Sequence, residues 1–154
     1  MISPFTNVNE ADWKEAQTPR GGIWKHIELS GERLGVRIEE MQPGDNSSEH
    51  HFHTLEEEHV LVLEGSATLI MDSGQYPLKA GDHVCFPGGK EDAHHIKNTS
   101  DAPFKFLVFG ERNMQDVVVY PEHQVMMVKA LDFKQFTYRP VKRAEAPNQE
   151  STTG

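Results

Sequence analysis

The chain has 154 residues, a length that suits one domain and leaves no room for a second full hydrophobic core. Fifteen Lys and Arg against 24 Asp and Glu give a formal net charge of −9, which argues against a nucleic-acid or anionic-membrane partner, because both need a basic face. The single cysteine, Cys85, excludes an intrachain disulfide and a zinc site built from several cysteines, so a reducing cytoplasm is the predicted location.

The first residues of the chain contain neither the basic nor the apolar segment of a signal peptide, and no apolar run reaches the roughly 20 residues of a membrane span. Residues 9–16 are the best candidate for a short helix, with Asn9 as its N-cap. Short apolar or alternating runs then follow one another and predict strands at 23–29, 34–41, 50–53, 58–63, 67–71, 75–78, 83–86, 94–98, 104–109, 117–120 and 125–130. Many short strands separated by turn residues are typical of an all-β sandwich or barrel. From residue 139 the chain becomes polar, which predicts a single domain over 1–138 and a tail over 139–154.

Histidine is the most informative residue type in this sequence. Seven of the nine histidines fall between His50 and His95, and histidine is the commonest metal ligand. His51 and His53 are two residues apart, so on a strand their imidazoles share one face. Glu58 follows after a turn, and His94 begins a later strand. Three imidazoles and one carboxylate suit a first-row transition metal, although on spacing alone a polar strand face explains these residues equally well.

Two spacing patterns around these residues resemble the two motifs of the cupin family. The first runs through Gly44, His51, His53, Glu58 and Gly65, and the second through Gly81, Pro87, Gly89, His94 and Asn98. The chain departs from the family pattern by one extra residue before His51 and two before His94, both in turns where insertion costs little.

The resemblance implies a double-stranded β-helix, which is a jelly-roll barrel, with its core at about 34–110. It also implies one divalent transition metal (Zn, Mn, Fe or Ni) held by His51, His53, Glu58 and His94.

Within that family the chain is similar to small bacterial single-domain proteins that carry the label of sugar-phosphate isomerases. The segments 50–58, 86–89, 110–113 and 116–121 carry this second resemblance. It implies an enzyme that acts on a small polar or carbohydrate-like substrate, with a metal-dependent isomerase favoured over a dioxygenase. A non-catalytic ligand-binding protein is the alternative from another class. The catalytic base stays open, with Glu111 and Tyr120 as candidates.

No glycine-rich phosphate loop is present, so a phosphorylated substrate would need scattered basic residues such as Arg37, Lys90 or Arg112. Each of these is also explained as a solvated surface charge. Arg37, Arg112 and Tyr120 are the predicted substrate-binding residues.

Other chemically active residues have structural explanations. Strand alternation predicts that His50, His59 and His95 point away from the metal ligands. Cys85 is predicted to be a small buried hydrophobic residue, with a thiol ligand as the alternative.

The strands at 58–63 and 104–109 are apolar on both alternating faces, which predicts a homodimer, because a thin barrel buries only one face of each strand. We expect the strand at 23–29 or the C-terminal tail to pack across the two-fold axis. The alternative is that segments before Leu34 and after Asp116 cover the second face within one chain.

Overall fold

The protein is described by a computed structural model that covers residues 5–17 and 23–140. Strands dominate it, as the sequence predicts, and the helical content is two single 3-10 turns. The strands are β1 (Lys14–Gln17), β2 (Ile23–Glu28), β3 (Leu34–Met41), β4 (Phe52–His53), β5 (Glu58–Glu64), β6 (Ser66–Met71), β7 (Gly74–Lys79), β8 (His83–Phe86), β9 (His94–Lys97), β10 (Phe104–Glu111), β11 (Val117–Tyr120), β12 (Val125–Val128) and β13 (Lys134–Thr137). The 3-10 turns are η1 (Pro121–His123) and η2 (Lys129–Leu131).

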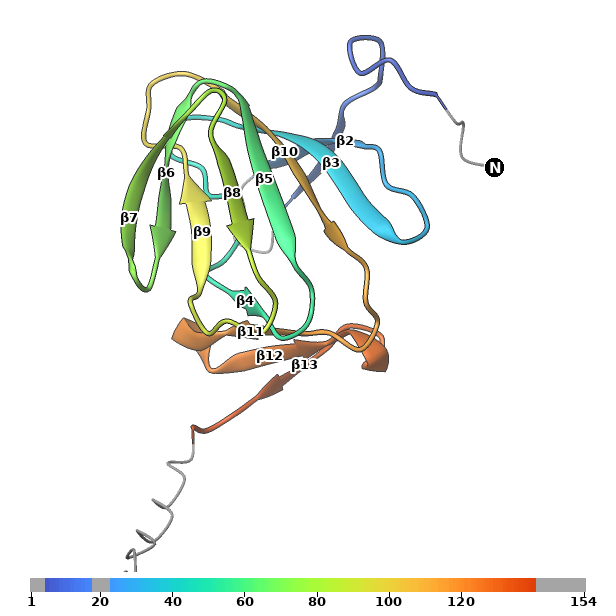
Figure 1. Ribbon diagram of the computed structural model, residues 1–154, viewed down its shortest axis with the longest axis vertical. Helices are drawn as coiled ribbons and strands as arrows, with labels where there is room; N and C mark the ends of the chain where they lie inside the picture. Colours follow the sequence, from blue (N-terminus) through green and yellow to red (C-terminus); the bar gives the residue numbers. More distant parts are fainter. Residues whose placement is uncertain (1–4, 18–22, 141–154) are drawn as a thin grey trace, which may run out of the picture.

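Three antiparallel sheets make up the fold (Figure 1). A six-stranded sheet has the order β1-β2-β3-β10-β5-β8, and a three-stranded sheet has the order β7-β6-β9. A third sheet, in the order β13-β12-β11-β4, lies at one end of the other two (Figure 1). This two-layer arrangement with a capped end is the predicted double-stranded β-helix, or jelly-roll.

The hydrophobic core lies between the six-stranded and three-stranded sheets. Alternate residues of β5 and β10 point into it, so Val60, Val62, Phe104 and Phe106 are almost completely buried. Leu69, Leu78 and Ile96 face them from the β6, β7 and β9 side. The alternating residues of the opposite face remain partly exposed, as Leu63 does with 37% of its surface accessible.

The predicted short helix at residues 9–16 is wrong. Residues 8–10 form a turn, and Lys14–Gln17 form strand β1, which pairs with β2. A helix of two turns is marginal in water without a packed face, whereas β1 gains a full ladder of hydrogen bonds from its neighbour.

The two halves of the barrel are joined where residues 44–53 run beside β9. Backbone hydrogen bonds link His51 and His94 in both directions, at 3.2 Å and 2.8 Å, and Gly44 donates to the carbonyl of Asn98 at 2.8 Å. The side chain of Asn98 is fully buried and donates to the carbonyls of Met41 and Ala102. This junction places the two histidine-bearing segments side by side.

The two ends of the described chain lie in different sheets. Strand β2 extends the six-stranded sheet beside β3. Strand β13 ends at Thr137, and most of the predicted polar tail, residues 141–154, lies outside the described residues. Within residues 5–17 and 23–140, no helix has the length and apolar character needed to cross a membrane.

Candidate metal centre

A cavity of about 590 Å³ opens where the third sheet meets the barrel. Strands β3, β5, β9, β10, β11 and β12 all contribute to its lining. The four predicted metal ligands also line it, namely His51, His53, Glu58 and His94. The structure therefore brings the four residues to one space, although they come from two segments more than 35 residues apart in the sequence.

His51 presents one ring nitrogen to this cavity. Its Nδ1 lies 2.7 Å from the backbone carbonyl of Glu49, and because a carbonyl only accepts, Nδ1 carries the proton. Nε2 is left with the lone pair that a metal needs. Burial is the main cause that lowers the pKa of His51 to about 4, so the ring is neutral near pH 7.

His53 is oriented by a buried carboxylate. Its Nδ1 donates to Oδ2 of Asp116 at 2.7 Å, which again leaves the lone pair on Nε2. Burial would raise the pKa of Asp116, but hydrogen bonds from His53 and from the backbone of Leu55 outweigh it and hold this pKa well below its usual value. A histidine held by a carboxylate in this way is a common support for a metal ligand.

His94 has the most telling environment of the four residues. Its ring stacks on Phe86 with the centroids 3.5 Å apart, and its Nε2 is buried without a hydrogen-bond partner in the described part of the chain. The closest charged atom recorded for it is Oε1 of Glu58, at 3.9 Å. A buried ring nitrogen without a hydrogen bond is costly, and a bound cation would satisfy it.

Glu58 supplies the negative charge. Burial would raise its pKa, but the neighbouring imidazoles, first that of His94 and then that of His51, outweigh burial and lower it. An ionised carboxylate and three imidazoles suit Zn, Mn, Fe or Ni. The ring centroid of His51 lies 4.9 Å from that of His94 and 5.2 Å from that of His53. The residues present thus fit a divalent transition metal.

Gly110 explains how Glu58 comes to this position. It pairs with Glu58 across the β5–β10 ladder, and a Cβ at Gly110 would lie 2.6 Å from the carbonyl oxygen of Glu57. Only a glycine allows the two strands to approach so closely at the mouth of the cavity.

Three charged residues that the sequence did not single out form a network behind His53. Nζ of Lys129 pairs with Oε2 of Glu56 and lies 3.2 Å from Oδ2 of Asp116. Donor atoms of His53, Glu56 and Asp116 lie within 4.8 Å of one another, but the ammonium of Lys129 already neutralises the carboxylates. We therefore interpret this cluster as a support for His53.

A second missed residue, Glu39, is buried in the cavity wall and lies 3.0 Å from Nε of Arg37. Burial raises its pKa, and the charge of Arg37 offsets only part of that effect. In the sequence Glu39 is followed by Glu40, and the pair looks like a solvated acidic edge. Only the strand register shows that Glu39 faces the barrel interior opposite Phe106.

The predicted substrate-binding residues Arg37, Arg112 and Tyr120 all line the cavity. Arg112 donates to the carbonyl of Gly31 at 3.2 Å. The ring of Tyr120 lies 5.9 Å from that of His51, and burial raises the pKa of its hydroxyl, which therefore stays protonated near neutral pH.

Two other candidates, one for phosphate binding and one for the catalytic base, are less well placed to act on a substrate in this cavity. Lys90 does not line this cavity but a separate one of about 150 Å³. Glu111, a candidate base, is exposed at the rim and accepts a hydrogen bond from the backbone of Glu57 at 3.4 Å.

His50 and His95 point away from the cavity, as strand alternation predicts. Their Nδ1 atoms lie 3.0 Å apart, and Nε2 of His50 lies 2.9 Å from Oδ1 of Asp72. His50 is nevertheless buried, so this face of the segment packs inside the protein.

The low pKa of His51 makes stability depend on pH in the metal-free protein. The unfolded chain binds a proton near pH 6.5, whereas the folded chain resists it down to about pH 4. The contribution of His51 to the free energy of unfolding is therefore fully present above pH 6.5. Up to about 3 kcal/mol of it is lost as the pH falls from 6.5 to 4. Urea unfolding in the presence of a chelator at several pH values measures this loss. The His51→Asn variant should flatten the slope, and His123→Asn should keep it; equal slopes in both variants would contradict the assignment.

Comparisons with known proteins agree with this fold. The family model for the cupin domain matches residues 37–110. Protein SchB of Streptomyces halstedii is 34% identical over 76 residues, which are 49% of this chain. The match covers 51% of that protein, so the chain spans about half the length of this relative.

Two crystal structures resemble the chain over most of its length. A sugar phosphate isomerase from a cupin superfamily, from Silicibacter pomeroyi, is 28% identical with a TM-score of 0.72, covering 80% of this chain and 85% of that protein. A protein of Acidithiobacillus ferrooxidans, provisionally named a sugar phosphate isomerase, is also 28% identical, with a TM-score of 0.79 and coverage of 88% and 93%. Residues 37–110 thus match the cupin domain, and the chain shares its double-stranded β-helix with these two neighbours.

Proposed function

We propose that the chain is a metal-dependent enzyme of the isomerase type that acts on a small, uncharged, carbohydrate-like substrate. His51, His53, Glu58 and His94 would hold one divalent transition metal. The observation that carries this proposal is the buried Nε2 of His94, which has no hydrogen bond and faces a cavity shared with the lone-pair nitrogens of two other histidines.

A metal bound by four protein atoms keeps open positions and supplies Lewis-acid stabilisation of a substrate oxygen. The remaining work falls to the residues of the chain. The hydroxyl of Tyr120 stays protonated and donates a hydrogen bond to the substrate. Glu39, a buried carboxyl group in the cavity wall whose pKa burial raises, is the proton carrier that we propose in place of Glu111.

The charges of the cavity favour an uncharged substrate over a phosphate ester. The lining holds three basic side chains, Arg37, Arg112 and Lys129, and four carboxylates, Glu39, Glu56, Glu58 and Glu111. Each of the basic side chains lies within 4.0 Å of a carboxylate in the described structure. A phosphate dianion would have to break one of these pairs, so the cavity suits hydroxyl and carbonyl groups better.

An activity screen tests this function. The protein loaded separately with Zn, Mn, Fe or Ni should interconvert neutral aldoses and ketoses, and it should turn over their phosphate esters at least tenfold more slowly. Turnover of phosphate esters alone would contradict the substrate class. Oxygen consumption with the iron form would point to a dioxygenase, and ligand binding without turnover would point to a non-catalytic cupin.

The two candidate proton carriers are separated by matched variants. Glu39→Gln should lower kcat by about 100-fold or more with metal content unchanged, because it removes the proton carrier but keeps the size of the side chain. Glu111→Gln should change kcat by less than about threefold, a bound that follows from its exposed position at the rim. The reverse order would return the role to Glu111.

The metal ligands are tested by alanine variants of neighbouring histidines. His51→Ala and His94→Ala should lose most of the metal bound at the cavity, because each removes a coordinating nitrogen. His50→Ala and His95→Ala should retain it, since those rings face Asp72 and each other. Elemental analysis of protein purified without chelator provides the measurement, and equal loss in all four variants would show that the assignment is wrong.

We also propose that two chains associate through the outer face of the six-stranded sheet. Leu107 lies between Leu61 and Ile38 in the strand register; Ile38 is buried within the chain, but Leu61 and Leu107 are partly exposed. The segment after Asp116 covers the end of the barrel and not this face (Figure 1). A cytoplasmic location stays a prediction from the single cysteine.

Sedimentation equilibrium at micromolar concentration tests the association. We expect a species of twice 17.4 kDa, and Leu107→Glu should convert it to a single chain because it places a charge on the apolar face. A wild-type protein that sediments as one chain would contradict the dimer.

A further inference from the structure

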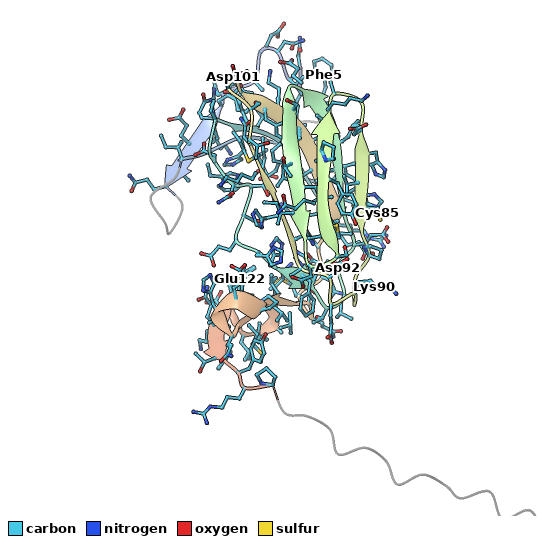
Figure 2. The ribbon with its side chains drawn as sticks, turned by 90° about the vertical axis from the view of Figure 1, so that its left-hand side faces the viewer. Phe5, Cys85, Lys90, Asp92, Asp101 and Glu122 are labelled. Carbon is cyan, nitrogen blue, oxygen red and sulfur yellow. The ribbon has the colours of Figure 1, made fainter. Side chains whose placement is uncertain are left out.

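The β5–β8 pair carries chemically active residues on both of its faces. In the ladder Glu58 pairs with Phe86, and these residues face the cavity, whereas the next pair, His59 and Cys85, faces the opposite side. Glu57, directly before β5, adds a carboxylate to this outer side. Cys85 is exposed at the sheet edge (Figure 2), so the prediction that it is a buried hydrophobic residue is wrong.

Three donor atoms converge on this outer face. Nε2 of His59 lies 2.9 Å from Oε1 of Glu57 and 4.0 Å from Sγ of Cys85. The donor atoms of the three residues all lie within 4.8 Å of one another. Around a tetrahedral zinc ion, neighbouring nitrogen, oxygen and sulfur ligands are about 3.3–3.6 Å apart. One observed separation is about 0.4 Å shorter and the other about 0.4 Å longer than that range, so the three donor atoms lie close to the spacing of a zinc site.

Two neighbouring rings hold His59 in place. Nε2 of His83 lies 3.0 Å from Nδ1 of His59, and Phe109 stacks on the His59 ring with centroids 5.0 Å apart and the planes 5° from parallel. These contacts fix the ring so that Nε2 faces the thiol and the carboxylate. A partner on the second ring nitrogen is the usual support for a histidine metal ligand.

From this geometry we infer that Glu57, His59 and Cys85 form a second metal site, which binds a zinc-like divalent cation on the outer surface, with His83 as a positioning residue. One thiolate, one imidazole and one carboxylate are the ligand types that zinc takes in proteins, and a fourth position stays open to water. This site is separate from the proposed metal at the cavity and uses none of its four ligands.

Binding at this site releases a proton. Partial loss of solvent around the sulfur and then the charge of Glu57 raise the pKa of the exposed Cys85 thiol, so the metal-free thiol is protonated. When the cation binds, the S–H bond breaks, the thiolate electron pair forms the bond to the metal, and the proton leaves to solvent. The proton of His59 moves from Nε2 to Nδ1 of the same ring. From there it is donated in a hydrogen bond to Nε2 of His83, whose own proton is then on its Nδ1.

The thiol itself reports on the site, because Cys85 is the only cysteine in the chain. The test uses the full chain, freed of metal and carrying His51→Ala and His94→Ala, which remove two of the four cavity ligands. This chain is titrated with Zn²⁺ alone. We expect the rate of reaction of Cys85 with a thiol reagent to fall at least tenfold at saturating Zn²⁺. Addition of His59→Ala should restore the rate to within twofold of the zinc-free value, and His123→Ala, an exposed histidine elsewhere, should leave the protection intact.

A thiol rate that Zn²⁺ does not change, or equal protection in the His59→Ala variant, would overturn the site. If the cavity variants fail to fold, the wild-type chain is titrated with Co²⁺ to at least two equivalents, and a sulfur-to-metal charge-transfer absorption that Cys85→Ser removes should appear. Absence of that absorption would also overturn the site. Failure of the cavity metal leaves these readouts unaffected, since they follow the Cys85 sulfur.

Discussion

The two backbone hydrogen bonds between His51 and His94 are the contact on which the rest of the functional architecture depends. They join the segment before β4 to β9, and so they bring two stretches of sequence together at one end of the barrel. The imidazoles then lie close because the backbones are bonded, and not because the side chains attract one another. The buried Asn98 completes this junction by satisfying two carbonyls that would otherwise be unpaired.

The buried carboxylate next to the cavity keeps its charge because it is paired with hydrogen-bond donors and a positive charge. Asp116 is fully buried, yet it accepts hydrogen bonds from His53 and the backbone of Leu55 and lies beside Lys129. Such a carboxylate remains ionised because its partners replace the water that it has lost. This arrangement fixes which nitrogen of His53 carries the proton, and it does so from a part of the chain outside the residues that match the cupin family model.

Much of the fold was predictable from the sequence, because strand periodicity and turn residues are local signals. The resemblance to the two cupin motifs points to His51, His53, Glu58 and His94, and the structure places them around one cavity. Glu39 and Lys129 could not be found in this way. Their role depends on strand register and on contacts between distant segments, and neither leaves a pattern in the neighbouring residues. The apolar neighbours of Cys85 in the sequence predict a buried strand, whereas the alternation of β8 turns the thiol outward.

The capping sheet has a consequence for the order in which the protein matures. All four proposed ligands have been synthesised once His94 is added to the chain, but the carboxylate that orients His53 is Asp116, and the ammonium beside it belongs to Lys129. A nascent chain that stops short of Asp116 therefore holds an imidazole with no fixed tautomer and an open end to its barrel. Synthesis of the last strands both closes the cavity and sets its donor atoms, so a cation captured earlier would meet an immature coordination shell.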